Sequence, residues 1–233
     1  PYGAKSESQT QSFTVDNESE GGVKSSLVLD LPFDNNLNNM STNEFKITSK
    51  SITYTADRFG KPKKAAFFNG KSYVTVKKID ALELTEEFTL SVWIKPDVGY
   101  GNSHYGWVDI FGRWKGTGPQ LSSYILQLYI PDRKVVGGIH TGKKPNYMCF
   151  SNSELSEMQW THITYTFKNG LAQLYINGVL DATLPSGYPQ SSIYDLEIGW
   201  QDTKQAYFRG AMDDVRIYNR ALSDYEISVL AKR

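Results

Sequence analysis

The carboxylates of this chain are the first residues to test for chemistry, because hydrolysis of a glycosidic bond needs two of them. A retaining glycosidase places its pair about 5–5.5 Å apart, with one group ionised and the other protonated. Asp195 and Glu197 are spaced i, i+2 on a predicted strand and so share a face, with no third carboxylate at a useful offset. Asp213 and Asp214 are adjacent, so a regular strand would point them to opposite faces. We therefore predict that the protein is not an enzyme.

Cysteine and histidine offer little further chemistry. Cys149 is the single cysteine, which excludes an internal disulfide and a zinc site built from several cysteines. The three histidines are scattered without the His-Glu-x-x-His spacing of zinc proteases, and no Gly-x-Ser-x-Gly elbow or phosphate-binding glycine loop occurs. Nucleophilic and metal-dependent catalysis therefore have no candidate residues here.

Sugar binding has better candidates, since aromatic rings stack on the apolar faces of sugars while polar side chains bind the hydroxyls. The stretch from Gly99 to Phe150 is rich in aromatic residues set among Gly, Ser, Asn and Lys. Alternation along the strands around it, together with the aromatic residue just after the strand Ile193–Gly199, selects one candidate patch. Its predicted members are Arg113, Gln127, Tyr129, His140 and Trp200.

Trp200 follows a predicted strand and precedes the polar segment 201–205. Such a Trp either closes the core or forms a platform for a sugar at the rim of the binding face. Because the residues after it supply no apolar layer, we expect a platform. Truncation to Ala would then change stability by less than about 1 kcal/mol.

Short alternating runs separated by turn residues must position this patch, and they predict an all-β sandwich of antiparallel strands. Asn-Gly pairs at residues 69–70, 169–170 and 177–178 predict hairpin turns. The expected strands are Leu27–Phe33, Ala65–Phe68, Ser72–Val76, Phe88–Lys95, Val108–Trp114, Tyr124–Ile130, Lys134–His140, Trp160–Phe167, Leu171–Ile176, Val179–Leu184, Ile193–Gly199 and Phe208–Tyr218.

The two ends of the chain differ from this pattern. Ser223 and Glu226 form a capping box for a short amphipathic helix over Asp224–Leu230, and a further helical turn is possible around Ser153–Met158. Residues 1–24 are polar and predict a linker or disordered arm before a domain over residues 25–233.

Composition excludes two classes of protein. The 233 residues carry 25 Lys and Arg against 25 Asp and Glu, and a balanced charge argues against a nucleic-acid partner. No apolar run is long enough for a transmembrane segment.

Several segments in order resemble the laminin-G-like domains of the concanavalin A-like lectin/glucanase superfamily, particularly those of bacterial exported proteins. They are LPFDNN (31–36), AAFFNGKSYVTV (65–76), EFTLSVWIKP (87–96), QWTHITYTFKNGLAQLYINGVL (159–180), LEIGW (196–200) and FRGAMDDVRIYNRALSDYEISVL (208–230). The resemblance implies a jelly roll of two curved sheets that binds glycan on the concave sheet or its rim. It also implies an extracellular, cell-surface or periplasmic protein with a further domain upstream.

The same resemblance bears on metal and catalysis. It implies a structural calcium held by Asp34, by carbonyls around Gly70, and by Asp213, although PFDNN departs from the commoner Phe-Asp-Gly form. The Glu-x-Asp-x-x-Glu string of the related glucanases does not occur in this chain.

We therefore expect a noncatalytic carbohydrate-binding module. A protein–protein or adhesion module is the first alternative, and a glycosidase with an atypical site is the second. Aromatic rings with polar neighbours on the binding face favour a carbohydrate-binding module. A flat apolar patch favours adhesion, and a close carboxylate pair favours the glycosidase.

Overall fold

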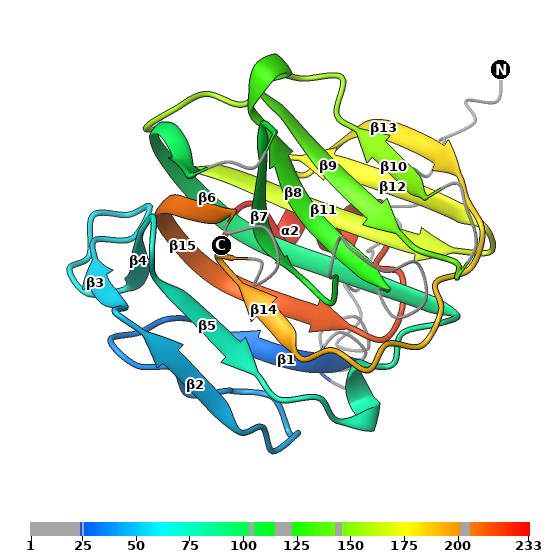
Figure 1. The fold of residues 1–233 in the computed structure, drawn as a ribbon, viewed down its shortest axis with the longest axis horizontal. Helices are drawn as coiled ribbons and strands as arrows, with labels where there is room; N and C mark the ends of the chain where they lie inside the picture. The colour runs from blue at the N-terminus through cyan, green and yellow to red at the C-terminus, as the bar shows by residue number, and fades with distance from the viewer. Residues whose placement is uncertain (1–23, 25, 103–104, 115–122, 143–145, 201–205) are drawn as a thin grey trace, which may run out of the picture.

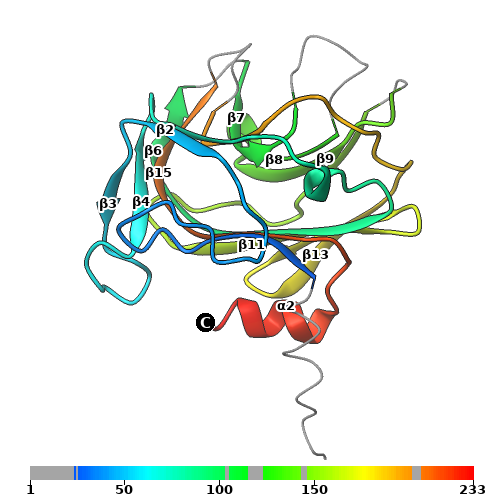
Figure 2. The same cartoon turned by 90° about the horizontal axis from the view of Figure 1, so that it is seen from below.

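A computed structural model describes residues 24, 26–102, 105–114, 123–142, 146–200 and 206–233, and its strands form two layers (Figures 1 and 2). Most of the predicted arm, residues 1–23, lies outside the described residues. The front sheet has the order β2 (Ile47–Lys50), β5 (Tyr73–Val76), β14 (Leu196–Ile198), β7 (Trp107–Gly112), β8 (Tyr124–Tyr129), β9 (Lys134–Ile139) and β10 (Tyr147–Phe150).

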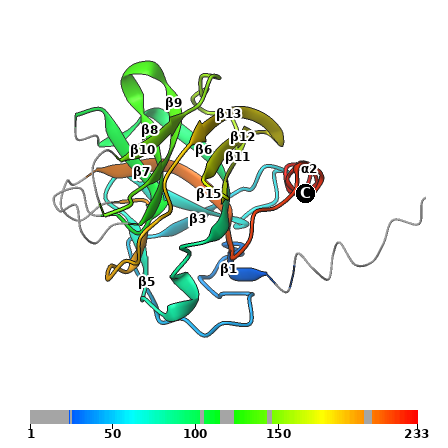
Figure 3. The ribbon, with the colours of Figure 1, turned by 90° about the vertical axis from the view of Figure 1, so that its right-hand side faces the viewer.

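The back sheet lies behind it and carries the helix on its outer side (Figure 3). Its order is β13 (Val179–Pro185), β12 (Leu171–Ile176), β11 (Thr161–Lys168), β6 (Glu87–Asn102) and β15 (Tyr207–Tyr218). Two strands pair with successive halves of β15: β4 (Ala65–Asn69), which also pairs with β3 (Thr53–Thr55), and β1 (Leu27–Leu31). The predicted jelly roll of two antiparallel sheets is confirmed, with one parallel contact between β7 and β15 joining the layers.

The core lies between the two sheets because each strand alternates apolar and polar side chains. In β6 the residues Phe88, Leu90, Val92 and Ile94 are buried in this core. Tyr165 of β11 packs across the layers onto Gly137 of β9, where an added Cβ atom would lie 2.3 Å from the tyrosine ring. The glycine is therefore required by the close approach of the two sheets.

Two of the three predicted Asn-Gly hairpins form as expected. Asn169 and Asn177 have φ of 51° and their glycines have φ of 74° and 81°, as a type I′ turn requires. The prediction at Asn69-Gly70 was wrong, because β4 pairs within the back sheet and β5 within the front sheet. This segment crosses between layers, and the strand pattern on either side of it carries no sign of which sheet each strand joins.

Strands β2, β3 and β10 were not predicted. They are short, and β2 and β3 expose much of their polar surface, so they lack a clear alternation. The segment Ser153–Met158, where a short turn was possible, forms a turn at residues 157–158 and no helix. Two 3-10 turns occur instead, at Asp80–Leu82 and Ile130–Asp132.

The predicted helix is present as α2 (Asp224–Leu230) and packs on the outer face of the back sheet. Ile227 and Leu230 bury against Tyr175 and Tyr218. The capping box forms, with the Ser223 backbone N–H donating to the Glu226 carboxylate at 2.8 Å. Described residues include no helix with the length and apolarity needed to cross a bilayer.

Replacing Glu226 by Gln is expected to lower stability by about 1 kcal/mol at pH 7, after allowing for its solvent exposure. Hydrogen bonds from Arg220 hold the pKa of Glu226 at about 2, below the ordinary 4.5. A depressed pKa gives stability that is present above pH 4.5 and lost as the pH falls towards 2. Urea unfolding at several pH values should show the free energies of unfolding of the two proteins converging as the pH falls. A constant difference between them would contradict the depressed pKa of Glu226.

Candidate functional site: the outer face of the front sheet

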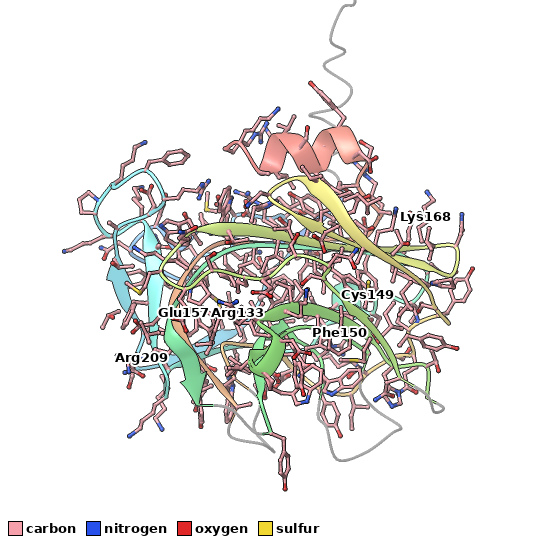
Figure 4. All side chains as sticks on the ribbon, turned by 90° about the horizontal axis from the view of Figure 1, so that it is seen from above. Arg133, Cys149, Phe150, Glu157, Lys168 and Arg209 are labelled. Atoms are coloured by element: carbon pink, nitrogen blue, oxygen red, sulfur yellow. The ribbon has the colours of Figure 1, made fainter. Side chains whose placement is uncertain are left out.

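Aromatic side chains gather on the outer face of the front sheet, away from the core. Trp107, Tyr129 and Phe150 form one group, which we call the front aromatic cluster. The ring centroids of Trp107 and Tyr129 are 4.7 Å apart, and Phe150 lies 5.9 Å from Trp107 and 6.1 Å from Tyr129. Phe150 is 41% exposed and lies in the layer remote from α2 (Figure 4). The cluster therefore offers apolar ring surface to solvent.

The orientation of this cluster follows from strand alternation. Val108, Leu128 and Cys149 are buried in the core, so their neighbours Trp107, Tyr129 and Phe150 face outward. Tyr129 was predicted for the site. Trp107 was noted only as an aromatic of the rich stretch, and Phe150 was missed because β10 was not predicted.

A second aromatic group, the stacked triad, lies on the same face and contains the predicted residue Trp200. Its indole stacks on Tyr73 at 4.2 Å and on Tyr207 at 5.7 Å between ring centroids, with planes within 22°. Tyr73 comes from β5 and Tyr207 from the start of β15, so the triad joins distant parts of the sequence. The apolar layer that the sequence analysis did not expect is thus supplied from other strands.

Strand register connects the two groups. Tyr207, Asp109, Gln127, Val136 and Phe150 are successive cross-strand partners over β15, β7, β8, β9 and β10. Four interstrand steps make this row about 19 Å long. Aromatic residues therefore stand at both ends of one row across the sheet.

Two of the three middle residues of this row, Asp109 and Gln127, are polar. Gln127, a predicted site residue, donates from Nε2 to Oδ1 of Asp109 at 2.5 Å, and the two side chains are only 4% and 2% exposed. Because both residues are buried and joined by this hydrogen bond, the pair is a rigid support between the aromatic groups. Asp109 was missed, although its alternation with Val108 and Ile110 placed it on this face.

His140 lies on the same side of the sheet but in a different environment. It is buried, its ring packs edge-on against Trp114 at 5.4 Å, and its Nδ1 accepts from the Gly142 backbone N–H at 3.0 Å. Burial lowers its pKa, so the imidazole is neutral at physiological pH. His140 therefore positions the segment that follows β9.

Arg113 is not on the binding face, and this correction changes its role. Its side chain is fully buried, and its guanidinium donates to the carbonyl oxygens of Leu82 (2.6 Å), Tyr194 (2.9 Å) and Ser192 and to the Glu83 carboxylate (2.8 Å). The prediction placed it opposite Trp114 by alternation. Beyond the end of β7, however, the segments around Leu82 and Ser192 enclose it.

The other aromatic residues between Gly99 and Phe150 lie in different environments. Tyr100 is buried and its hydroxyl donates to the Leu155 carbonyl at 2.8 Å, while Tyr105 is 86% exposed. His104 lies outside the described residues, as does the segment 201–205.

Asp195, one of the two carboxylates singled out on the strand before Trp200, is bound to lysines rather than free in the described part of the chain. Asp195 accepts from the Lys77 ammonium at 2.8 Å and from the Lys78 backbone N–H at 2.9 Å. Both contacts hold the side chain at the start of β14, beside the end of β5. Asp195 is thus engaged structurally.

The three residues predicted to hold calcium do not fit that ion. Gly70 lies beside Arg209, whereas Asp213 is four residues further along β15, a distance of about 13 Å. The Asp34 carboxylate pairs with Lys64 at 2.8 Å and that of Asp213 with Arg58 at 2.6 Å. Within the described ranges, no three His, Cys, Asp or Glu residues group as metal ligands would.

Truncating Trp200 to Ala is expected to lower the free energy of unfolding by about 2–3 kcal/mol, because a half-buried ring loses packing and two stacking contacts. This replaces the expectation of less than about 1 kcal/mol, which assumed no second layer. Urea unfolding of Trp200→Ala beside Tyr225→Ala, an exposed ring on α2, measures the difference. Equal stability of the two variants would contradict the stacked triad.

Comparison with known proteins gives the same architecture. The sequence model of one family, described as the concanavalin A-like lectin/glucanases superfamily, matches residues 68–228. Adhesion G-protein coupled receptor V1 of Danio rerio is 25% identical over 182 residues, which is 71% of this chain and 3% of the receptor. The chain thus spans a small part of that relative.

Two solved structures are similar over most of the chain. Domain 4 of AbnA, an extracellular arabinanase of Geobacillus stearothermophilus solved with arabinotriose, has a TM-score of 0.68 and 25% identity, covering 88% of this chain and 98% of the domain. The ligand-binding domain of botulinum neurotoxin serotype D, solved with N-acetylneuraminic acid, has a TM-score of 0.74 and 16% identity. Coverage is 92% of this chain and 52% of that domain, so this similarity concerns the fold alone.

Proposed function

We propose that this chain, which belongs to the concanavalin A-like lectin/glucanase superfamily, is a noncatalytic carbohydrate-binding module. The observation that carries the proposal is the pair of aromatic groups on the outer face of the front sheet. Phe150 stands at one end of the row, Trp107 and Tyr129 lie beside its middle residues on β7 and β8, and the stacked triad stands at the other end through Tyr207. Sugars bind to such rings through their apolar faces.

The similar structures support this proposal. The arabinanase domain was solved with an oligosaccharide and the toxin domain with a sugar acid. The first domain belongs to an extracellular enzyme and the second to a toxin. We accordingly propose that this module serves an exported or cell-surface protein, together with a further domain.

The absence of catalysis is part of the proposal. Asp109 is bonded to Gln127, and Asp195 is bonded to Lys77. A retaining mechanism needs one free nucleophilic carboxylate and one protonated partner about 5–5.5 Å away. Reducing-sugar assays on polysaccharides that bind should therefore show no turnover.

A glycan array followed by isothermal titration calorimetry of the hits tests the proposal. Specific binding of an oligosaccharide, lost when the front aromatic cluster is disrupted, is the expected result. The array should include arabinan fragments and sialylated glycans, so that neutral and acidic ligands are compared directly. Binding to no glycan, or binding that front-face variants leave intact, would overturn the site.

Adhesion to a protein is the second candidate, favoured by an exposed apolar group on the opposite side of the molecule. Val179 and Leu180 beside the β12–β13 turn are 69% and 44% exposed, and Tyr225 of α2 is 60% exposed. The turn packs on α2, since a Cβ atom at Gly178 would lie 2.9 Å from Ala231. Variants on this side should leave glycan binding unchanged. They would weaken the binding of a protein partner only if that partner docks on this side.

A further inference from the structure

The Asp213 carboxylate, which family resemblance assigned to calcium, lies within a network of buried arginines. Arg58 donates from Nη1 to Asp213 at 2.6 Å and from Nη2 to Asp214 at 2.8 Å. Its Nε donates to the Arg233 carbonyl oxygen at 2.6 Å. All three nitrogens of one guanidinium are thus bound to oxygen.

A bulge in β15 makes this arrangement possible. Register with β6 shifts between Asp213 and Arg216, and Asp214 has a φ of 50°. Adjacent carboxylates point to opposite faces only in a regular strand. The bulge instead turns both carboxylates towards Arg58.

The position of Arg58 is fixed by its own surroundings. It lies in the β3–β4 connection, where the Asp57 side chain accepts from the backbone N–H groups of Phe59 (2.9 Å) and Lys61 (2.8 Å). The guanidinium carbon lies 4.7 Å from the Phe59 ring centre and 4.8 Å from that of Trp93. A planar cation between two rings is a geometry that a hydrated metal ion would not adopt.

A second arginine completes the charge compensation. Arg216 donates to Asp214 at 2.7 Å and to Asp30 at 3.0 Å. Side chains of Arg58 and Asp213 are only 10% and 5% exposed. The acidic pair therefore requires a cation held inside the protein.

We propose that the Arg58 guanidinium is that cation, occupying the space at which Asp213 and Asp214 would otherwise hold a divalent metal ion. The fold is then calcium-independent, unlike the expectation from the family. Arg58 also ties the β3–β4 connection and the Arg233 backbone to the back sheet. This inference concerns the β3–β4 connection and the second half of β15, and it does not rest on the proposed function.

Thermal unfolding of the whole chain, with chelator and with added calcium, tests the proposal. The wild-type melting temperature should be the same in both. Arg58→Met should melt roughly 10 °C lower, because it leaves buried carboxylates uncompensated. The matched control Arg209→Met, which breaks an exposed pair with Asp97, should shift by no more than about 2 °C.

Two further measurements separate a cation substitute from an ordinary ion pair. Calcium should raise the melting temperature of Arg58→Met and not that of the wild type, because the two freed carboxylates face one space. Adding Asp213→Asn to Arg58→Met should recover part of the loss and abolish the calcium response.

Three results would overturn the proposal. They are a wild-type melting temperature that falls with chelator and recovers with calcium, an Arg58→Met variant as stable as the wild type, and a folded variant that gains no calcium response. If Arg58→Met does not fold, Arg58→Gln takes its place, and the wild-type chelation result stands without either variant.

Discussion

Replacing Arg113 by Met is expected to lower the free energy of unfolding by about 3–5 kcal/mol, since it leaves several buried hydrogen-bond acceptors without their donor. The guanidinium bonds Glu83 and the carbonyl oxygens of Leu82, Ser192 and Tyr194, none of which the methionine can satisfy. The melting temperature should fall by roughly 10–15 °C, because a domain of this size loses about 2–4 °C per kcal/mol. Differential scanning calorimetry measures it directly.

The control for this prediction is Arg133→Met, which removes a solvent-exposed arginine paired with Glu154 and should change stability by less than about 1 kcal/mol. Glycan affinity of the folded Arg113→Met protein should equal that of the wild type. A variant that keeps its melting temperature but loses glycan affinity would show that Arg113 takes part in glycan binding.

Truncating Trp107 to Ala is expected to weaken glycan binding by about 30-fold, which corresponds to about 2 kcal/mol for a central aromatic contact. Trp107 touches both Tyr129 and Phe150, so its loss removes ring surface and also the support of the other two rings. Calorimetric titration with the glycan identified on the array measures the change, alongside the melting temperature to confirm folding.

Tyr225→Ala is the matched control, because it removes an exposed aromatic ring from α2 on the opposite side of the molecule. Its glycan affinity should equal that of the wild type. Equal weakening by the two variants would show that the ligand does not bind at the front aromatic cluster. Weakening by Tyr225→Ala alone would move the site to the α2 side.

Fold prediction succeeded where a local pattern has a local cause. The capping residues Ser223 and Glu226 specify the start of α2, and its bounds agree with the prediction. β12 also agrees, since an Asn-Gly turn borders it on each side. The weakly alternating strands β2 and β3 could not be predicted, because their pairing with β5 and β4 is what makes them strands.

The candidate site was predictable only in part. Alternation correctly placed Gln127 and Tyr129 on the outer face of β8, because strand periodicity extends along a single segment. It failed for Arg113, which follows the end of β7 and is enclosed by residues at least 30 positions away. The partners of Trp200 likewise come from residues 73 and 207, which only the folded sheet brings together.

The sequence by itself thus determined the strand faces, two type I′ turns, the capped helix and the antiparallel sandwich, because each depends on spacing within one or two neighbouring segments. Tertiary structure alone decided that Asn69-Gly70 crosses between sheets, that Arg113 is buried and that Asp213 and Asp214 share Arg58. Each of these depends on long-range pairing or on the bulge in β15, which local periodicity does not encode. The row from Tyr207 to Phe150 also depends on tertiary structure, since its residues lie on strands whose order in the sheet differs from their order in the chain.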